Sequence, residues 1–381
     1  MMKLNFVYLP IIVLLLTSIT DSDWGHAKMA EISISNAKKK YPNFELGPIN
    51  LNIKSGEFFG IFGPPSSGKT SILRMILGLL DADSGEVSIN GKDATNLKVD
   101  ERNLSMVFQN LALFPHMNGK ENITFPLSEK KIETSKISER LNAVSSVLHI
   151  EHILHKNPSQ MSGGERQRIA LGRAFITDSD AMLLDEPIAA LDARLREEMR
   201  IELKRLQREN KQTFVYVSHD EEEVLAISDR VAIVIDGRIA QVGTPSEIYE
   251  MPNSISVGGI VGSPPMNFFS GILNKSGKKI DCDNFSVSFD NKTLSIKDKS
   301  VTLGVRPEDL WPTDNLEDNG FAVDVTSSEP LGSYTVVNAK LDKQDIKIRL
   351  QGQKMMGMGE KLNLQVDTRK MHLFNSNGER I

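Results

Sequence analysis

Apolar positions in the first two thirds of the chain fall into short runs separated by amphipathic stretches. From Glu31 to about Gly243 this alternation is typical of a mainly parallel sheet covered by helices. It predicts buried strands at Phe58–Phe62, Ala181–Leu184, Thr213–Val217 and Val231–Ile235. It also predicts a helix at Ile72–Leu77 that ends at Gly78, a charged helix at Arg194–Asn210, and a hairpin turn at Asp236-Gly237.

Helical periodicity fades after about residue 250, and short β-rich runs take its place. These runs are Phe285–Phe289, Ser300–Gly304, Phe321–Val325, Tyr334–Leu341 and Ile346–Leu350. Asn, Asp, Gly and Pro separate them, which predicts a small all-β barrel or sandwich. We therefore expect an α/β domain at 29–250 and a β-rich domain at 251–381.

Composition narrows the function classes. The 381 residues include 45 Lys plus Arg and 50 Asp plus Glu, for a net charge of −5. This balance gives no general electrostatic reason to bind nucleic acid, so we expect no nucleic-acid partner. A single cysteine, Cys282, excludes an internal disulfide and a multi-cysteine metal site.

An eight-residue segment between a predicted strand and a predicted helix fits G-x-x-x-x-G-K-[ST]. Its residues are Gly63, Pro64, Pro65, Ser66, Ser67, Gly68, Lys69 and Thr70. Backbone N–H groups and the positive end of a helix suit such a loop to anionic phosphates. Lys69 is then expected to reach the β- and γ-phosphates of ATP, and Thr70 to ligate Mg²⁺.

Two carboxylates, Asp185 and Glu186, follow the predicted strand at Ala181–Leu184. The carboxyl end of a parallel strand lies at the same sheet edge as a phosphate-binding loop of that sheet. We expect Asp185 to hold Mg²⁺ and Glu186 to orient or deprotonate the attacking water.

The segment Ser162, Gly163, Gly164, Glu165 precedes another amphipathic stretch. Ser162 and Glu165 form the S-x-x-E pattern of a helix capping box. The two glycines also expose N–H groups at a helix N-terminus, which suits a phosphate. The pattern alone does not choose between the two roles.

Together these residues resemble the nucleotide-binding subunits of ABC transporters. The order and spacing match from Tyr41 through the P-loop, Gln109, the Ser162–Glu165 signature, Asp185-Glu186 and Asp192 to His219. The resemblance implies a P-loop ABC ATPase domain with a helical subdomain. It also implies a dimer in which each ATP lies between the P-loop of one subunit and the signature of the other.

The resemblance assigns a role to each matching residue. Tyr41 stacks on adenine, and Ser71 joins the P-loop residues in binding ATP. Gln109 senses Mg²⁺ and the γ-phosphate and links to the membrane subunits. His219 contacts the γ-phosphate, and Asp192 joins the two sites across the dimer. The expected catalytic residues are Glu186, His219 and Gln109, and the expected Mg²⁺ ligands are Thr70, Gln109 and Asp185.

The later chain resembles importers that carry an extra OB-like regulatory β domain, most closely the maltose and glycerol-phosphate types. The matching segments are Gly262–Phe269, Leu303–Asp309 and Glu329–Ser333. Polyamine, iron and sulfate importers share much of this architecture, and a regulatory ABC ATPase without transport is a further alternative. The last two segments also fit turns that merely shape the β domain.

The partners implied are two integral membrane permease subunits and, indirectly, an extracytoplasmic solute-binding protein. The chain is then expected at the cytoplasmic face of the inner membrane.

Two residues depart from the family pattern. Ser66 stands where this branch often has glycine, and Glu165 stands where the signature usually has glutamine. A carboxylate near a partner's phosphates is repulsive unless it turns back into the helix cap. Both a homodimer and a heterodimer with a second ATPase subunit therefore stay open.

Residues 1–28 form a separate N-terminal segment. After Lys3, the run Phe6–Ile19 is apolar except at three positions, and it is shorter than the roughly 20 residues that a membrane span needs. Met29 then opens an alternating strand pattern. Because an exported ATPase would find little ATP, we interpret residues 1–28 as an upstream start-site extension, with an N-terminal anchor as the alternative.

Overall fold

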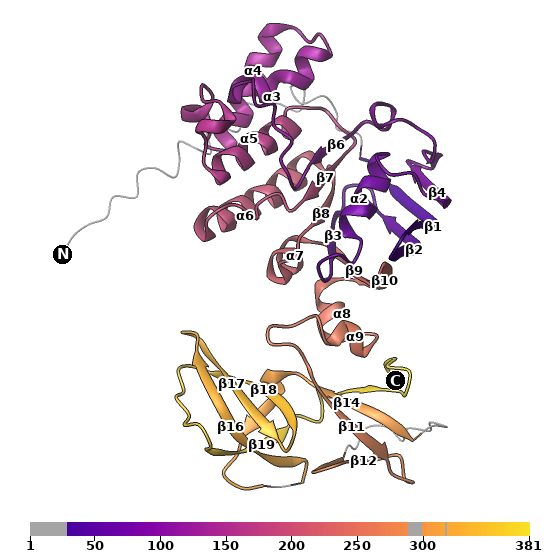
Figure 1. Cartoon of the computed structure of the whole chain (residues 1–381), viewed down its shortest axis with the longest axis vertical. Coiled ribbons are helices and arrows are strands. Elements are labelled where there is room, and N and C mark those ends of the chain that lie inside the picture. The colour runs from indigo at the N-terminus through magenta and orange to yellow at the C-terminus, as the bar shows by residue number, and fades with distance from the viewer. Residues whose placement is uncertain (1–28, 289–298, 317) are drawn as a thin grey trace, which may run out of the picture. The chain divides into compact units, whose positions relative to one another are not determined.

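The structure is a computed structural model that describes residues 29–288, 299–316 and 318–381. It divides into two compact units, the first reaching to Ile239 and the second covering Ala240–Ile381 (Figure 1). The apolar run Phe6–Ile19 and the last residue of the predicted strand Phe285–Phe289 lie outside the described residues. None of the helices in the described ranges is long and apolar enough to cross a membrane.

A six-stranded sheet forms the centre of the first unit, in the order β10-β9-β3-β8-β7-β6, and its edge strand β10 runs past Ile239, where that unit ends. The ladders that join β9, β3, β8, β7 and β6 are parallel. The bounds are β3 (Phe58–Phe62), β6 (Leu104–Val107), β7 (Ala181–Asp185), β8 (Thr213–Val217), β9 (Arg230–Ile235) and β10 (Arg238–Gly243). Every residue of β3, β7 and β8 is buried, as expected of parallel strands covered on both faces. These strands confirm the predicted parallel sheet.

A second sheet in the same unit is antiparallel, and the prediction of a mainly parallel sheet did not include it. Its order is β2-β1-β4-β5, with β1 (Ile32–Tyr41), β2 (Phe44–Ile53), β4 (Ser84–Ile89) and β5 (Lys92–Asp93). In β1, Ile32 and Ile34 are buried while Ser35 is exposed. A strand with only one buried face alternates in this way, which is typical of antiparallel sheets.

The helices of the first unit fall into two groups. Helices α3, α4 and α5 pack on one another beside the sheets, while α2 packs against β7 and β8 (Figure 1). The bounds are α2 (Lys69–Leu77), α3 (Gly119–Glu129), α4 (Thr134–Val147), α5 (Gly163–Phe175), α6 (Ala193–Asn210) and α7 (Glu221–Ile227), with 3-10 turns at η1 (Val99–Arg102), η2 (Glu151–Ile153) and η3 (Pro158–Gln160). Helix α2 ends at Gly78, which adopts a left-handed φ of 86° as a C-cap.

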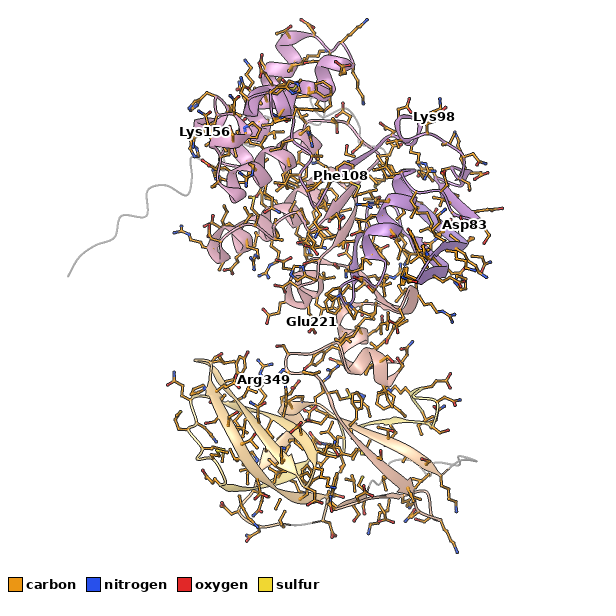
Figure 2. All side chains as sticks on the ribbon, in the orientation of Figure 1. Asp83, Lys98, Phe108, Lys156, Glu221 and Arg349 are labelled. Atoms are coloured by element: carbon orange, nitrogen blue, oxygen red, sulfur yellow. The ribbon has the colours of Figure 1, made fainter. Side chains whose placement is uncertain are left out.

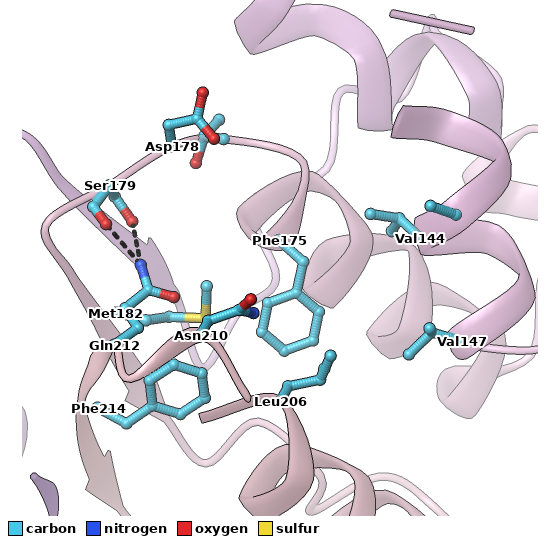
Figure 3. A pocket seen from close by; sticks show the side chains of 12 residues that line it. Val144, Val147, Phe175, Asp178, Ser179, Met182, Leu206, Asn210, Gln212 and Phe214 are labelled. Atoms are coloured by element: carbon cyan, nitrogen blue, oxygen red, sulfur yellow. Dashed lines mark hydrogen bonds between the residues drawn. The ribbon is translucent and has the colours of Figure 1, made fainter. Parts of the chain in front are cut away.

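A small cavity of about 60 Å³ lies where α4 and the end of α5 meet α6 and strands β7 and β8 (Figure 3). Its lining is mainly apolar and includes Val144, Val147, Phe175, Leu206 and Phe214. At its rim, Gln212 Nε2 donates to the carbonyl oxygen of Ser179 at 2.6 Å. The interface between the helical group and the sheet layer is therefore apolar, and side chains do not fill it completely.

The second unit contains two five-stranded sheets in the orders β13-β12-β11-β14-β20 and β15-β19-β16-β17-β18. One hydrophobic core draws residues from both sheets, among them Phe269, Leu303, Val323 and Ile348. The strands are β11 (Asn267–Leu273), β12 (Lys279–Cys282), β13 (Ser286–Ser288), β14 (Ser300–Val305), β15 (Leu310–Pro312), β16 (Gly320–Pro330), β17 (Tyr334–Leu341), β18 (Gln344–Gln351), β19 (Lys361–Val366) and β20 (His372–Phe374). Helices α8 (Pro245–Glu250) and α9 (Ile255–Gly258) precede them, and η4 (Pro307–Asp309) follows β14.

Side chains occupy the space between the elements of each unit (Figure 2). In the second unit, Asn267 shows how the two sheets are joined. Its Nδ2 donates to the carbonyl oxygen of Lys347 at 2.8 Å, and its Oδ1 accepts from the Lys347 N–H at 2.9 Å. This side chain in β11 therefore pairs with the backbone of β18 much as a neighbouring strand would.

Candidate functional site

The loop from Gly63 to Thr70 connects the end of β3 to the start of α2, as the pattern predicts. A Cβ atom on Gly63 would lie 2.0 Å from the carbonyl oxygen of Val234, so only glycine fits there. Gly68 caps α2 with φ of 105°, a conformation that side chains rarely adopt. The Ser67 hydroxyl is buried without a hydrogen-bond partner among the described residues. A tight backbone loop with an unpaired buried hydroxyl at a helix N-terminus fits a phosphate group.

Ser66 also has a positive φ, of 62°. This conformation suits the glycine that related chains often have at this position, because a left-handed backbone costs other residues roughly 1–2 kcal/mol. The Ser66 side chain is exposed, as is that of Pro65, while Pro64 is half-buried. The loop therefore accepts the serine without crowding the core.

Lys69 opens α2, and its ammonium group is held close to the loop. Nζ donates to the carbonyl oxygens of Gly63 and Pro64, each at 2.8 Å. Burial lowers the pKa of Lys69, while the carboxylates of Glu186 and Asp185 oppose that shift. A cation kept beside a phosphate-binding loop suits the role predicted for Lys69.

Thr70 and Asp185 meet across the sheet edge, 115 residues apart in the chain. Thr70 Oγ1 donates to Asp185 Oδ1 at 3.2 Å. Burial raises the pKa of Asp185, and the bond from Thr70 opposes that shift. One hydroxyl and one carboxylate are a donor set that Mg²⁺ accepts when phosphate oxygens and water complete its shell.

Glu186 lies just beyond the end of β7 and contacts two of the predicted catalytic residues. Gln109 Nε2 donates to Glu186 Oε2 at 3.3 Å, and His219 Nδ1 lies 3.0 Å from Oε1. A histidine that carries its proton on Nδ1 donates in this geometry. The fold therefore brings Gln109, Glu186 and His219 together from the ends of three neighbouring strands, β6, β7 and β8.

Tyr41 ends β1 and lies near the start of α2. Its hydroxyl donates to Ser71 Oγ at 3.4 Å, and its ring centre is 6.0 Å from that of Phe44. The ring is half-buried. Tyr41 and Ser71 are therefore neighbours beside the P-loop, although they are 30 positions apart.

The signature residues form the capping box that the spacing predicts. Ser162 caps α5, its Oγ accepting from the Glu165 N–H at 3.2 Å, while Glu165 Oε2 accepts from the Ser162 N–H at 2.7 Å. Glu165 Oε1 also pairs with Lys156 Nζ at 2.8 Å. Because of the Lys156 bond and the Ser162 N–H, the pKa of Glu165 falls to about 2. The carboxylate thus turns back into the cap, the alternative that relieves its repulsion.

Asp192 caps α6 by accepting from the Leu195 N–H at 3.0 Å. Within the described residues, no hydrogen bond or ion pair joins Ser162, Glu165 or Asp192 to the P-loop of the same chain. The cross-dimer roles implied for these residues stay predictions.

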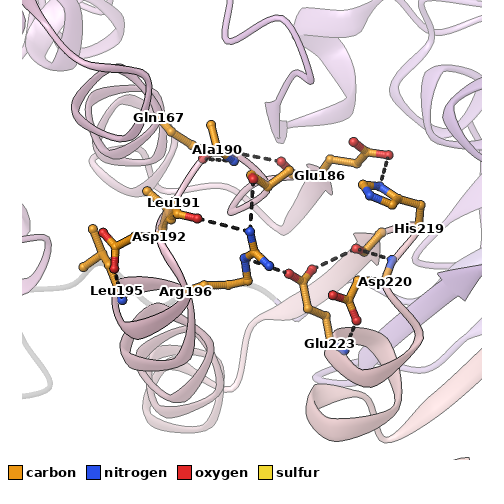
Figure 4. A network of polar contacts seen from close by, with 12 residues as sticks. Gln167, Glu186, Ala190, Leu191, Asp192, Leu195, Arg196, His219, Asp220 and Glu223 are labelled. Carbon is orange, nitrogen blue, oxygen red and sulfur yellow. Dashed lines mark hydrogen bonds and ion pairs between the residues drawn. The ribbon is translucent and has the colours of Figure 1, made fainter. Parts of the chain in front are cut away.

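A network of polar contacts surrounds the loop after Glu186 (Figure 4). Gln167 Nε2 donates to the Glu186 carbonyl oxygen at 3.0 Å, and its Oε1 accepts from the Ala190 N–H at 2.9 Å. Arg196 Nη2 donates to the carbonyl oxygen of Leu191 at 3.1 Å, and Arg196 Nε lies 3.5 Å from Glu223 Oε1. The loop is therefore held from both α5 and α6.

Four residues of these contacts were not predicted from the sequence, namely Lys156, Gln167, Arg196 and Glu223. For Gln167 a signal exists, because it lies on the same helical face as Ala170, Leu171 and Ala174, all of them buried. A glutamine within an apolar stripe predicts a buried, hydrogen-bonded amide.

Comparison with known proteins connects this geometry to a family. The family model for the ABC transporter matches residues 46–189, the MalK OB fold domain matches 262–310 and the TOBE domain matches 303–374. The oligosaccharides import ATP-binding protein MsmX of Bacillus subtilis is 36% identical over 362 residues, covering 92% of this chain and 99% of the relative. This chain belongs to the ABC transporter family. It is an ABC-type ATPase followed by an OB and TOBE region.

Other relatives of this ABC ATPase match over a similar length. The sulfoquinovosyl glycerol transport ATP-binding protein SmoE of Agrobacterium fabrum is 37% identical over 356 residues, covering 92% of this chain and 99% of the relative. The sn-glycerol-3-phosphate import ATP-binding protein UgpC of Psychromonas ingrahamii is 35% identical over 360 residues, covering 91% of this chain and 94% of the relative. These matches extend through both compact units.

Solved structures match the ATPase part. The dimeric structure of MJ0796, a bacterial ABC transporter cassette, has a TM-score of 0.53 and 31% identity, covering 56% of this chain and 98% of that chain. The same cassette is known in a dimeric post-hydrolysis state bound to ADP and Pi, with a TM-score of 0.53, 30% identity and the same coverage of both chains. This ABC ATPase therefore has the fold of a nucleotide-binding cassette.

The β region of the ABC ATPase contains the segment Leu303–Asp309. Arg306 within it is 2% exposed, and its guanidinium donates to the carbonyl oxygens of Val261 and Tyr249. The same guanidinium lies 3.8 Å from the centre of the Tyr249 ring. These contacts favour the structural interpretation of the segment over direct ligand contact.

Proposed function

We propose that this chain is the ATP-hydrolysing motor of an importer that takes up a sugar or a sugar derivative. The names of MsmX, SmoE and UgpC support this solute class, since they describe import of oligosaccharides and glycerol phosphate and transport of a sulfoquinovosyl glycerol. The aligned regions cover 92% of this chain, so they include its β domain and not only its ATPase. The chain then acts with a second ATPase subunit, identical or different, and with two membrane permease subunits at the cytoplasmic face of the membrane.

The arrangement around Glu186 carries the catalytic part of this proposal. Its carboxylate lies between the Gln109 amide and the His219 imidazole, beside the sheet edge that holds Thr70 and Asp185. Such a carboxylate can accept the proton of a water molecule that attacks a phosphoryl group. Mg²⁺, held by Thr70, Asp185 and Gln109, would neutralise charge on the phosphates.

The P-loop supplies the binding half of the mechanism. Lys69 and the N–H groups of the Gly63–Thr70 loop would hold the phosphates of ATP, and Tyr41 would stack on the adenine. His219 would contact the γ-phosphate and keep the Glu186 carboxylate in place. The signature and Asp192 of a second subunit would close the site when ATP is bound.

A glutamine at position 186 tests this mechanism. Because an amide cannot act as a base, Glu186→Gln should bind ATP normally and hydrolyse it about 10²- to 10⁴-fold more slowly. The measurement is steady-state phosphate release and nucleotide affinity, for the chain alone and with its permease subunits. Hydrolysis at the wild-type rate in Glu186→Gln would reject the role of Glu186. Uptake by vesicles containing the complex, tested with sugars, polyamines, iron and sulfate, identifies the solute class.

A further inference from the structure

Glu186 has an unusual backbone conformation for a residue with a side chain. Its φ is 51°, in the left-handed region. Its N–H donates to the carbonyl oxygen of Val217 at 2.9 Å, which ties it to the end of β8. A left-handed backbone at a residue other than glycine persists only when surrounding contacts hold it. The carbonyl side of Glu186 must therefore be held as well.

Gln167 holds that carbonyl. Its Nε2 donates to Glu186 O at 3.0 Å, and its Oε1 accepts from the Ala190 N–H at 2.9 Å. The side chain is 2% exposed. Both ends of one buried amide are therefore used by the loop between β7 and α6 (Figure 4).

We propose that Gln167 is a positioning residue for ATP hydrolysis, which acts by fixing the backbone of Glu186. This inference rests on the catalytic role proposed for Glu186. The direction of the Glu186 side chain depends on the same backbone torsions that the Gln167 bond restrains. Without that bond, the Glu186 carbonyl keeps only the longer bond from the Ala189 N–H at 3.4 Å. The Glu186 backbone can then leave the left-handed region, and the carboxylate moves away from Gln109 and His219.

Gln167 lies on the helix that begins at the signature, so it can also link the signature to Glu186. The helix begins at Gly163, directly after the cap residue Ser162, so Gln167 lies just over one turn inside it. A shift of the signature therefore moves the group that holds Glu186. In the assembled dimer, closing the signature on the partner's nucleotide would therefore move Gln167. Through its amide, Gln167 would then shift the Glu186 carboxylate of the same chain.

The expected effect is on turnover and not on nucleotide binding. A displacement of about 1 Å at a catalytic group can cost roughly 10²-fold in rate. Gln167→Met fills a similar volume but can neither donate to Glu186 nor accept from Ala190. We expect its kcat to fall roughly 10- to 100-fold while KM for ATP stays within about threefold, because the P-loop contacts of Lys69 do not involve Gln167.

Gln207 provides a matched control in the same unit. It is 4% exposed, and its Nε2 donates to the carbonyl oxygen of Gly56 at 2.6 Å, so it too is a buried glutamine bonded to backbone. Gln207→Met should lower the melting temperature to a similar extent but leave kcat within about twofold of wild type. Equal kcat losses in the two variants would assign the Gln167 effect to general destabilisation and overturn the proposal.

Hydrogen exchange gives a readout that does not depend on turnover. The Ala190 amide should exchange faster in Gln167→Met and remain protected in Gln207→Met, because only the former loses its acceptor. If Gln167→Met does not fold, Gln167→Asn keeps a buried amide that is one methylene too short to span both partners, and its kcat should also fall. Wild-type kcat in a folded Gln167 variant would overturn the inference.

The two proposals fail in different ways. If Glu186→Gln is inactive and Gln167→Met turns over at the wild-type rate, only the positioning role is rejected. If Glu186→Gln itself turns over at the wild-type rate, the proposed mechanism fails, whatever the Gln167 variants do.

Discussion

Two helix N-termini in the first unit are implied to bind phosphate, and they are built in opposite ways. Helix α2, which follows the P-loop, starts at Gly68 with no side-chain cap and no acidic residue in its first turn. Helix α5, which follows the signature, has a complete capping box and carries Glu165 in its first turn. No side chain caps the first N–H groups of α2, so they remain available to a ligand. At α5, in contrast, the Ser162 hydroxyl already accepts a hydrogen bond from the Glu165 N–H.

The electrostatic surroundings differ in the same direction. At α2 a buried cation, Lys69, faces the carboxylates Asp185 and Glu186. At α5 the carboxylate of Glu165 is neutralised by Lys156. The surroundings of the P-loop therefore fit the primary anion site predicted from the sequence, whereas the ion pair with Lys156 leaves the Glu165 side of the signature close to neutral.

The largest effect is expected when the cation beside the P-loop is removed. Lys69→Ala removes the only side-chain cation bonded to the loop in the described structure. ATP affinity should fall more than tenfold and hydrolysis at least 10²-fold, because the phosphate charge loses its main counterion. Nucleotide titration and phosphate release measure both, and unchanged ATP affinity would contradict a primary anion site.

A smaller effect is expected at the signature. Lys156→Ala leaves Glu165 without its ion-pair partner, so an uncompensated negative charge would stand beside the nucleotide that the signature is predicted to bind across the dimer. We expect a loss of roughly fivefold in hydrolysis, which corresponds to about 1 kcal/mol.

The double variant Lys156→Ala/Glu165→Gln should recover most of that loss, since glutamine keeps the capping box without the charge. Failure of the double variant to recover activity would show that Lys156 acts in some other way.

The pH dependence of stability sharpens the same contrast. The pKa of Glu165 is lowered from 4.5 to about 2 in the folded chain. A lowered pKa stabilises the folded state above the unfolded value of 4.5, and this contribution is lost as pH falls toward 2. Wild type should therefore exceed Glu165→Gln in free energy of unfolding at pH 7, and the difference should shrink between pH 4.5 and pH 3. Urea unfolding at these pH values measures it, and a constant difference would contradict the ion pair.

The smallest effect is expected for Ser67→Ala. The Ser67 hydroxyl is buried without a hydrogen-bond partner in the described residues, so its removal should leave the melting temperature unchanged or slightly raised. ATP affinity should fall by roughly threefold if this hydroxyl bonds a phosphate. Thermal melting with and without ATP separates the two results, and a loss of stability without ATP would show that the hydroxyl has a structural partner.

The elements nearest the chemistry could be predicted from the sequence because their signals are local. The strand Phe58–Phe62, the end of α2 at Gly78 and the capping box at Ser162 depend on residues within a few positions of one another. The fold class follows from the same periodicities. Patterns with short repeats and named turn residues are therefore enough to locate the P-loop and the signature.

The remaining features depend on contacts between distant parts of the chain. The bond from Gln167 to Glu186 spans 19 positions. The positive φ of Glu186 has no marker in the sequence, because position 186 is not a glycine. The partner of Glu165 lies nine positions before it, in a segment without periodicity. Strands β11, β12, β15, β19 and β20 were not predicted, since several are only three or four residues long and pair with strands far away.

Side chains do not completely fill the space between the helical group α3–α5 and the sheet layer of the first unit. The pocket there has a volume of about 60 Å³, is partly open, and is lined by Val144, Phe175 and Leu206 among others. Because the lining side chains lack contact partners on the side of the pocket, this boundary gains less dispersion energy than a fully packed one would.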